Sequence, residues 1–192
     1  MDYFAHMKGK LYSHIQSKYS FSDCQMVFLS HGIDIIVNDS INMLFLLFIA
    51  FISRDLFQGI VYLLSFTSMR RHSGGWHAST RLLCFLSYQL VFVFLLVCSN
   101  FITDFRIIIL MFLGSISYII KNAPVQHIYN PLTEQEVINN RNKLVRNLVL
   151  ICLAFSAFSL YESHYAFTIC YASSWNALCM SLLKHSNMWR KT

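Results

Sequence analysis

The sequence predicts an all-α membrane protein with about six short transmembrane or partly re-entrant helices, preceded by an N-terminal amphipathic helix in the membrane interface. Three observations support this prediction: 56% of the 192 residues are hydrophobic, only 12% are charged, and the apolar residues fall into six long runs. Soluble domains carry about 25% charged residues, so this composition excludes a water-soluble globule. We expect residues 1–192 to form a single membrane domain.

The first predicted element is an amphipathic helix in the region 1–30. Its apolar side chains recur at the spacing of one helical face, and they are Phe4, Met7, Leu11, Ile15 and Tyr19. Lys8 and Lys10 lie elsewhere around that helix. A basic amphipathic helix can rest in the headgroup region of a bilayer. An ordinary cytoplasmic helix packed on the rest of the chain is the alternative.

Six apolar runs follow along the chain, and each predicts one membrane helix. They span residues 35–53, 56–69, 82–98, 105–120, 148–161 and 165–183. A perpendicular helix needs about 20 residues to cross a bilayer. The runs 56–69 and 148–161 are shorter, so we expect either a locally thinned bilayer or partly re-entrant helices at these two places.

The Lys and Arg residues predict the orientation of these helices. All 15 of them except Arg54 and Arg106 lie in the N-terminal region, in the connections 70–81 and 121–146, or in the C-terminal tail. With six crossings these parts share one side, which the positive-inside rule places in the cytoplasm of a multi-pass cell-membrane protein. Both termini and the segment 70–84 should therefore be cytoplasmic. Because the positive charges are clustered between apolar runs, we expect the lipid bilayer, and no nucleic acid, as a partner.

The longest polar stretch, residues 121–146, is predicted to be a cytoplasmic loop that ends in a helix. Pro124 and Pro131 interrupt its first part. Thr133 is followed three residues later by Glu136. This is the pattern of a capping box, in which the two side chains satisfy backbone N–H groups at a helix start. We therefore expect a helix that begins directly after Thr133 and continues into the fifth apolar run.

The segment 70–84, with the sequence RRHSGGWHASTRLLC, concentrates reactive side chains at the cytoplasmic edge of a membrane helix. A cysteine reacts as the thiolate, which a neighbouring imidazole can generate by accepting the thiol proton. Cys84 is thus a candidate nucleophile, and His77 is a candidate general base and acid. On one regular helix their Cα atoms would lie about 10.5 Å apart along the axis, too far for a direct hydrogen bond. A helix that starts near Ser79, with the Ser79 hydroxyl as N-cap and His77 in the glycine-containing loop before it, would let His77 fold over Cys84.

The same segment contains further candidate residues with less specific signals. Arg70, Gly74 and Gly75 are candidate supporting residues, because cations favour a thiolate and glycines allow a tight turn. His72 is an alternative base, and Arg70 and Arg71 also fit plain positive-inside anchors. No Cys or His spacing in the chain is typical of a zinc site, so we expect no metal and no cofactor.

The segment resembles the core of the accessory gene regulator B family of Gram-positive bacteria, which are small multi-spanning cysteine endopeptidases that process quorum-sensing propeptides. The shared features are an arginine, a glycine-containing turn, His77 followed by Ala, and Cys84 at the start of a membrane helix. Downstream, residues 122–124 (NAP) and 130–133 (NPLT) resemble the family's Ala-Pro loop and its later Pro. The chain length and the number of apolar runs agree as well. The chain departs from the family in the segment 125–129, which reads VQHIY. The corresponding loop is often lysine-rich in the family, and this difference leaves substrate selection by the loop open.

The resemblance implies a cysteine peptidase that acts on a short amphipathic propeptide. Cys84 would attack a peptide carbonyl in the C-terminal part of the propeptide, and His77 would move the proton from the thiol to the leaving amine. A Cys or Ser side chain of the propeptide would then attack the acyl-enzyme thioester and release a cyclic thiolactone or lactone. Gln89 and Asn122 stay open as orienting groups, and backbone N–H groups at the helix start are the default oxyanion donors. A second copy of the chain is a further candidate partner.

Two other functions fit parts of the sequence. A small transporter or channel component would use Asn38, Asp39 and Asn42 near the first apolar run to line a polar path. A non-catalytic membrane scaffold would need none of these residues. Both alternatives predict that Cys84→Ser is mild, and neither explains why the Gly-Gly turn, His77 and Cys84 coincide.

Overall fold

A computed structural model of the chain describes residues 23–75, 80–102, 104–126 and 132–189. The predicted amphipathic helix of residues 3–19 lies outside the described residues. The chain divides into two compact units, Met1–Leu44 and Phe45–Thr192, and each is described by itself.

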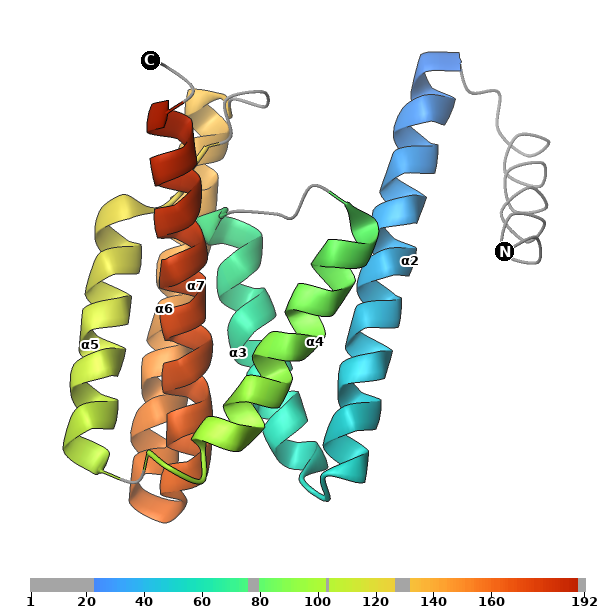
Figure 1. The fold of residues 1–192 in the computed structure, drawn as a ribbon. Helices are drawn as coiled ribbons and strands as arrows, with labels where there is room; N and C mark the ends of the chain where they lie inside the picture. Colours follow the sequence, from blue (N-terminus) through green and yellow to red (C-terminus); the bar gives the residue numbers. More distant parts are fainter. Residues whose placement is uncertain (1–22, 76–79, 103, 127–131, 190–192) are drawn as a thin grey trace. The chain divides into compact units, whose positions relative to one another are not determined.

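The described residues form six α-helices and no strand, which confirms the predicted all-α membrane fold. They are α2 (Asp23–Ile52), α3 (Leu56–Ser73), α4 (Arg81–Cys98), α5 (Phe105–Asn122), α6 (Glu134–Tyr161) and α7 (Ser163–Trp189), as labelled in Figure 1. The six predicted apolar runs correspond to these six helices in order. The capping box at Thr133 and Glu136 is also confirmed, and α6 begins directly after it.

Within the described part of the chain, four helical segments are long and apolar enough to cross a membrane. They are Ile35–Ile52, Phe105–Asn122, Glu134–Tyr161 and Ser163–Ser186. The apolar part of α4, Leu82–Cys98, is shorter. The predicted helix that begins after Thr133 and continues into the fifth apolar run is confirmed as the continuous 28-residue helix α6.

Helix α3 is not among those four segments, and polar side chains near its first residue pair with α7. The Gln58 side chain is buried, and its Nε2 donates to Oγ1 of Thr168 on α7 at 3.2 Å. Asp55 caps the helix by accepting from the Gln58 backbone N–H, and its Oδ2 lies 3.1 Å from Nε2 of His164. Polar groups are tolerated at membrane depth when they pair within protein. These contacts tie the beginning of α3 to α7 within the Phe45–Thr192 unit.

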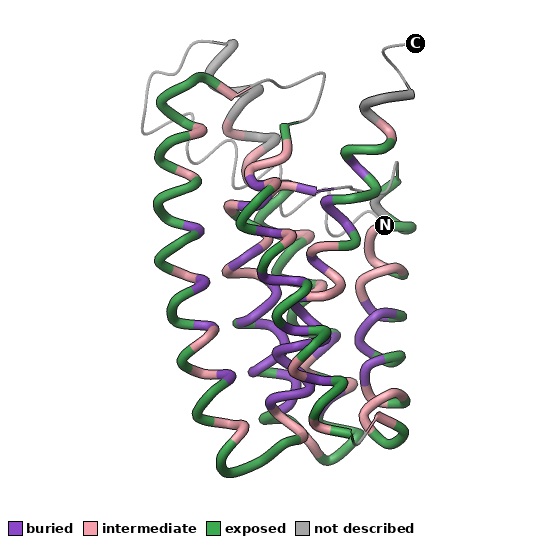
Figure 2. The backbone as a smooth tube through the Cα atoms, turned by 90° about the vertical axis from the view of Figure 1, so that its left-hand side faces the viewer, coloured by how far each residue is buried: buried purple, intermediate pink, exposed green. Residues whose placement is uncertain are grey.

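The core of this unit is built around α7, against which α3, α5 and α6 pack. Small residues on α7 allow close approach of its neighbours, and Ala166, Ala172 and Ser173 are fully buried there. Between α5 and α7, Oγ of Ser115 lies 2.8 Å from Oγ of Ser174. Figure 2 shows that buried and exposed positions alternate along the helices of this unit, as expected for helices with one protein-facing side.

An aromatic cluster joins α4 to α3 and α7. The ring centroids of Tyr62 on α3 and Phe92 on α4 lie 5.4 Å apart, and those of Phe66 and Tyr88 lie 5.7 Å apart. Tyr171 on α7 donates its hydroxyl hydrogen to the Val91 carbonyl of α4 at 3.0 Å. Aromatic pairs contribute about 0.5–1.5 kcal/mol each beyond their buried area. The cluster therefore holds α4 against α3 and α7.

Both units expose large apolar side chains. In the first unit Ile36 and Leu44 are 67% and 68% exposed, and in the second Leu110 and Leu160 are 71% and 83% exposed. Exposed apolar area costs about 25 cal/mol per Å² in water, and contact with lipid removes that cost. These surfaces support the membrane location that the helix lengths indicate.

The helix ends of the second unit alternate between its two ends. The last residues of α3 and α5, the first residues of α4 and α6, and the C-terminal end of α7 lie at one end of the second unit (Figure 1). The connections from α4 to α5 and from α6 to α7 lie at the other end. The described parts of segments 70–84 and 121–146 therefore meet at the same end of the unit.

Candidate active site

Cys84 lies at the end of the first turn of α4. The N-cap is Thr80, whose Oγ1 accepts from the Leu83 backbone N–H at 3.2 Å, and not Ser79 as expected. Ser79 itself lies outside the described residues. The Cys84 N–H donates to the Thr80 carbonyl at 3.0 Å, which is the first backbone hydrogen bond of the helix. Side chains on a helix lean toward its N-terminus, so the half-buried Cys84 thiol is directed toward the start of α4.

The predicted glycine turn follows directly after α3. Gly74 has φ 72° and ψ −169°, and Gly75 has φ 140°. Such conformations are almost restricted to glycine. A Cβ atom on Gly74 would overlap the Val125 carbonyl oxygen, and the Val125 N–H donates to the Ser73 carbonyl at 2.9 Å. The turn therefore lets the backbone after α5 approach the end of α3.

Arg70 connects this turn to Cys84. Its Nη1 donates to the Gly74 carbonyl at 3.2 Å, and a Cβ on Gly75 would overlap the guanidinium, which shows that the guanidinium rests on Gly75. Burial lowers the pKa of Arg70, while electrostatic interaction with Cys179 and then Cys84 raises it. Arginine stays cationic under both influences. Arg70 thus interacts electrostatically with Cys84 from a separate helix.

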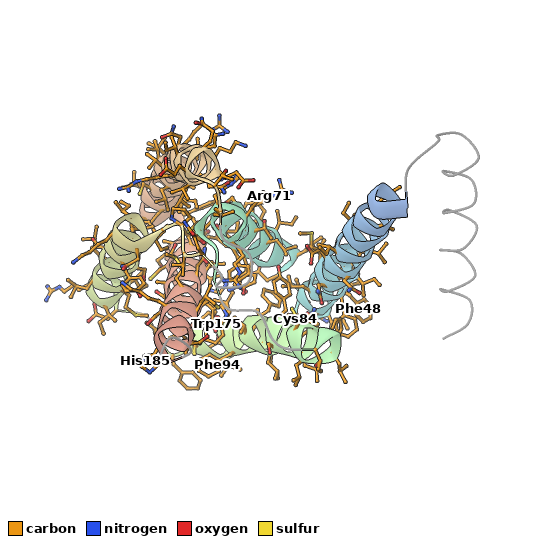
Figure 3. All side chains as sticks on the ribbon, turned by 90° about the horizontal axis from the view of Figure 1, so that it is seen from above. Phe48, Arg71, Cys84, Phe94, Trp175 and His185 are labelled. Carbon is orange, nitrogen blue, oxygen red and sulfur yellow. The ribbon has the colours of Figure 1, made fainter. Side chains whose placement is uncertain are left out.

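A cavity of about 370 Å³ opens beside the glycine turn. Its walls include Arg71, His72, Gly74, Gly75 and Asn140 together with the segment 124–126. Nδ1 of His72 lies 3.4 Å from Oδ1 of Asn140 on α6. Figure 3 looks down on the molecule with Arg71 labelled on α3 and Cys84 on α4. The cavity is large enough for a short stretch of peptide in contact with the turn.

The remaining predicted residues are placed as follows. His77 and Trp76 lie outside the described residues. Gln89 is buried on α4. The Asn122 side chain donates from Nδ2 to the Tyr118 carbonyl at 2.9 Å and accepts from Nζ of Lys184 at 2.8 Å. The Asn122 amide is therefore engaged with α5 and α7.

Three residues near the turn were missed as site residues by the sequence analysis. Oγ of Ser73 lies 3.2 Å from Oδ1 of Asn176 on α7, and both residues are fully buried. Cys179, expected to be a packing residue, is buried but also interacts with Arg70. Asn176 and Cys179 lie about a hundred positions after the turn, so no local pattern could have connected them to it. In the ranges that the structure describes, no group of three His, Cys, Asp or Glu side chains could hold a metal ion.

Comparison with known protein families gives a match over most of the chain. The family model for accessory gene regulator B matches residues 9–182. The match includes the whole segment 70–84, all of α3 to α6 and most of α7. No curated protein and no solved structure matches the chain.

Proposed function

This chain belongs to the accessory gene regulator B family, and on that premise we propose that it is a membrane-embedded cysteine endopeptidase of a quorum-sensing system. Its substrate is a short amphipathic propeptide, which it cleaves in the C-terminal part and releases as a cyclic thiolactone or lactone. The observation that carries this proposal is the position of Cys84 at the end of the first turn of α4, where it interacts electrostatically with the cationic Arg70. The multi-pass helical fold supports a reaction at the membrane edge.

The first step of the proposed mechanism is formation of the thiolate. The Arg70 guanidinium favours the negative form of Cys84, and the N-terminus of α4 adds a small contribution because the helix macrodipole acts mainly within the first turn. His77 accepts the thiol proton. The mechanism requires His77 to lie within hydrogen-bond reach of the Cys84 sulfur, directly or through one water.

Acylation follows. The Cys84 sulfur forms a bond to the carbonyl carbon of the scissile peptide, the carbon–nitrogen bond breaks, and His77 returns its proton to the leaving amine. The developing oxyanion needs hydrogen-bond donors. The first N–H groups of α4, at Arg81 and Leu82, precede the first backbone bond of the helix and are suited to this role.

Ring closure completes the cycle. A Cys or Ser side chain of the propeptide attacks the thioester carbonyl, the bond to the Cys84 sulfur breaks, and the proton of the attacking group passes to the thiolate through His77. Water would hydrolyse the same thioester, so a site that excludes water favours the ring over the linear acid. The cavity beside Gly74 and Gly75 offers room for part of the bound peptide at the glycine turn.

Substitution of the proposed nucleophile tests the function. The chain is co-expressed with a tagged propeptide, and the products are identified by mass spectrometry. We expect Cys84→Ala and His77→Ala each to abolish cleavage, whereas Cys98→Ala, a half-buried cysteine later in the same helix, leaves cleavage intact. Membrane fractions must contain each variant at the wild-type level. Full cleavage by Cys84→Ala would refute the peptidase proposal, and a mild Cys84→Ser variant would favour a transporter or scaffold.

A further inference from the structure

We propose that the cavity beside the glycine turn binds a carboxylate group of the propeptide through Arg71 and His72. The proposal rests on the proposed function, because it names a part of the peptide substrate that this chain recognises. The carboxylate is either an Asp or Glu side chain or the C-terminal carboxylate of the propeptide. The walls of the cavity, the contacts that hold them in place and their charge support this assignment.

Three parts of the second unit form these walls. The last turn of α3 contributes Arg71 and His72, the segment 124–126 follows α5, and Asn140 lies on the polar first half of α6. A backbone hydrogen bond of 2.9 Å holds the segment 124–126 to the last residue of α3. The place of the cavity is therefore fixed by contacts between segments that lie far apart in the sequence.

Two side-chain contacts hold the polar half of α6 against α3. Nδ2 of Asn147 donates to the Ser68 carbonyl at 2.9 Å. One turn later on α3, Nδ1 of His72 lies 3.4 Å from Oδ1 of Asn140, which precedes Asn147 by about two turns. The two helices thus run antiparallel here, and Asn140 is held at the cavity wall next to the imidazole.

The contact with Asn140 decides which ring nitrogen of His72 carries a hydrogen. An amide oxygen only accepts, so Nδ1 must be the donor in this contact. Nε2 takes no part in it and can meet a ligand. A bound carboxylate favours the imidazolium form, in which Nε2 also carries a hydrogen and donates to the carboxylate. Asn140 therefore keeps the imidazole in a form that is suited to binding an anion.

The charge of the cavity walls favours an anion as well. Arg71 is exposed, and a guanidinium can donate two parallel hydrogen bonds to one carboxylate. No Asp or Glu is among the described residues that line the cavity. Glu136, one turn before Asn140 on α6, is engaged with Thr133 in the capping box. A carboxylate that enters the cavity therefore meets cationic groups without an acidic side chain in the wall to compete for them.

The rest of the wall fits a peptide better than a free anion. Val125, Leu132 and Leu183 line it with apolar side chains. The cavity volume is about 370 Å³. A water molecule occupies about 30 Å³ in the liquid, so a carboxylate group alone would fill a small part of the cavity. We therefore expect the carboxylate to be carried by a peptide that places apolar groups next to it.

Equilibrium binding of a fluorescent propeptide to the full chain tests the proposal. The parent chain carries Cys84→Ala, so that binding is measured apart from cleavage, and it is held in nanodiscs of phosphatidylcholine, which has no net charge. We expect Arg71→Gln and His72→Gln each to raise the Kd about three- to tenfold. Arg141→Gln is the matched control and should leave the Kd unchanged. It removes an exposed positive charge that directly follows Asn140 but does not line the cavity.

Changes in the propeptide identify the source of the carboxylate. One synthetic form has every Asp and Glu replaced by Asn and Gln, and a second form has an amidated C-terminus. The form that lacks the bound carboxylate should bind the parent chain as weakly as the natural peptide binds Arg71→Gln. Adding Arg71→Gln should weaken the binding of that form no further, because the guanidinium and the carboxylate act as one pair.

Three results would overturn the proposal: no binding of any peptide to the parent chain, an unchanged Kd in Arg71→Gln, or an equal loss of affinity for all three peptides. If Arg71→Gln does not fold, His72→Gln decides by the same comparison. Cleavage of the propeptide by the Cys84→Ala chain would refute the peptidase proposal instead. The affinities would still decide whether the cavity binds a carboxylate, so the two failures are distinguishable.

Discussion

The substitution Gly74→Ala should destabilise the chain strongly although it adds a single methyl group. Gly74 has φ 72° and ψ −169°, a region of backbone conformation that residues other than glycine essentially avoid. The added Cβ would also overlap the Val125 carbonyl oxygen, which belongs to the backbone and cannot rotate away as a side chain could. The segment after α5 must therefore move away from the end of α3.

The cost has two parts. A residue held in such a conformation costs about 1–3 kcal/mol. Separation of the two segments also breaks the hydrogen bond from the Val125 N–H to the Ser73 carbonyl, for which a typical contribution is about 0.5–1.5 kcal/mol. The free energy of unfolding should thus fall by roughly 2–4 kcal/mol. For a chain of this size that corresponds to a midpoint of thermal unfolding lowered by roughly 5–15 °C.

Thermal unfolding in detergent micelles, at one scan rate for all variants, measures this shift. Gly114→Ala is the matched control, because nothing lies within 4 Å of a Cβ added there in the middle of α5. Alanine has the higher helix propensity, so this control should unfold at the wild-type temperature or a few degrees above it. If Gly74→Ala unfolds within about 2 °C of wild type, the argument that the turn requires glycine is wrong.

Three further predictions concern the thiol, the topology and the helix packing. In native membranes Cys84 should react with iodoacetamide at least about threefold faster than the similarly half-buried Cys98. Arg70→Gln should remove this difference in rate, because the guanidinium favours the Cys84 thiolate. Equal rates at the two cysteines in the wild-type chain would contradict that effect of the guanidinium. Reporter fusions to the two ends of the chain should both report the cytoplasm, because only two of the 15 Lys and Arg lie on the other side of the predicted topology; an external signal from either end would reverse the orientation. Gly59→Leu should reduce the yield of folded protein, since a Cβ at that position already lies 2.6 Å from Cβ of Ala50; wild-type yield and melting would show that these helices do not pack closely.

The fold was largely predictable because its signals are local. The apolar runs place the six helices, and the capping box places the start of α6 directly after Thr133. The start of α4 was one residue off, since Ser79 and Thr80 can both cap a helix and the backbone conformation at Thr80 decides between them. The continuity of α6 was predictable too, because its polar first half runs from the capping box into the fifth apolar run without a Pro or Gly.

The candidate site was predictable only in part, because some of its residues lie far apart in the sequence. Arg70, the glycine turn and Cys84 lie within fifteen residues of each other, so their types and spacing suggest a common site. Asn176 and Cys179 reach that site through the packing of α7 against α3, which no pattern in the segment 70–84 encodes. An asparagine and a cysteine within an apolar run look like ordinary packing residues until the neighbouring helix is known.

The polar character of α3 explains how such a site can be held at the edge of a membrane. Near its first residue α3 is tied to α7 by the bond from Gln58 to Thr168, and at its last residue by the contact of Ser73 with Asn176. Contacts at both ends leave α3 little freedom to slide or rotate against α7. Cys84 lies on α4, which is joined to the α3–α7 pair through aromatic packing and the Tyr171 hydroxyl. It follows that truncating Tyr171 should loosen the position of Cys84 relative to Arg70, while the α3–α7 pair keeps its geometry.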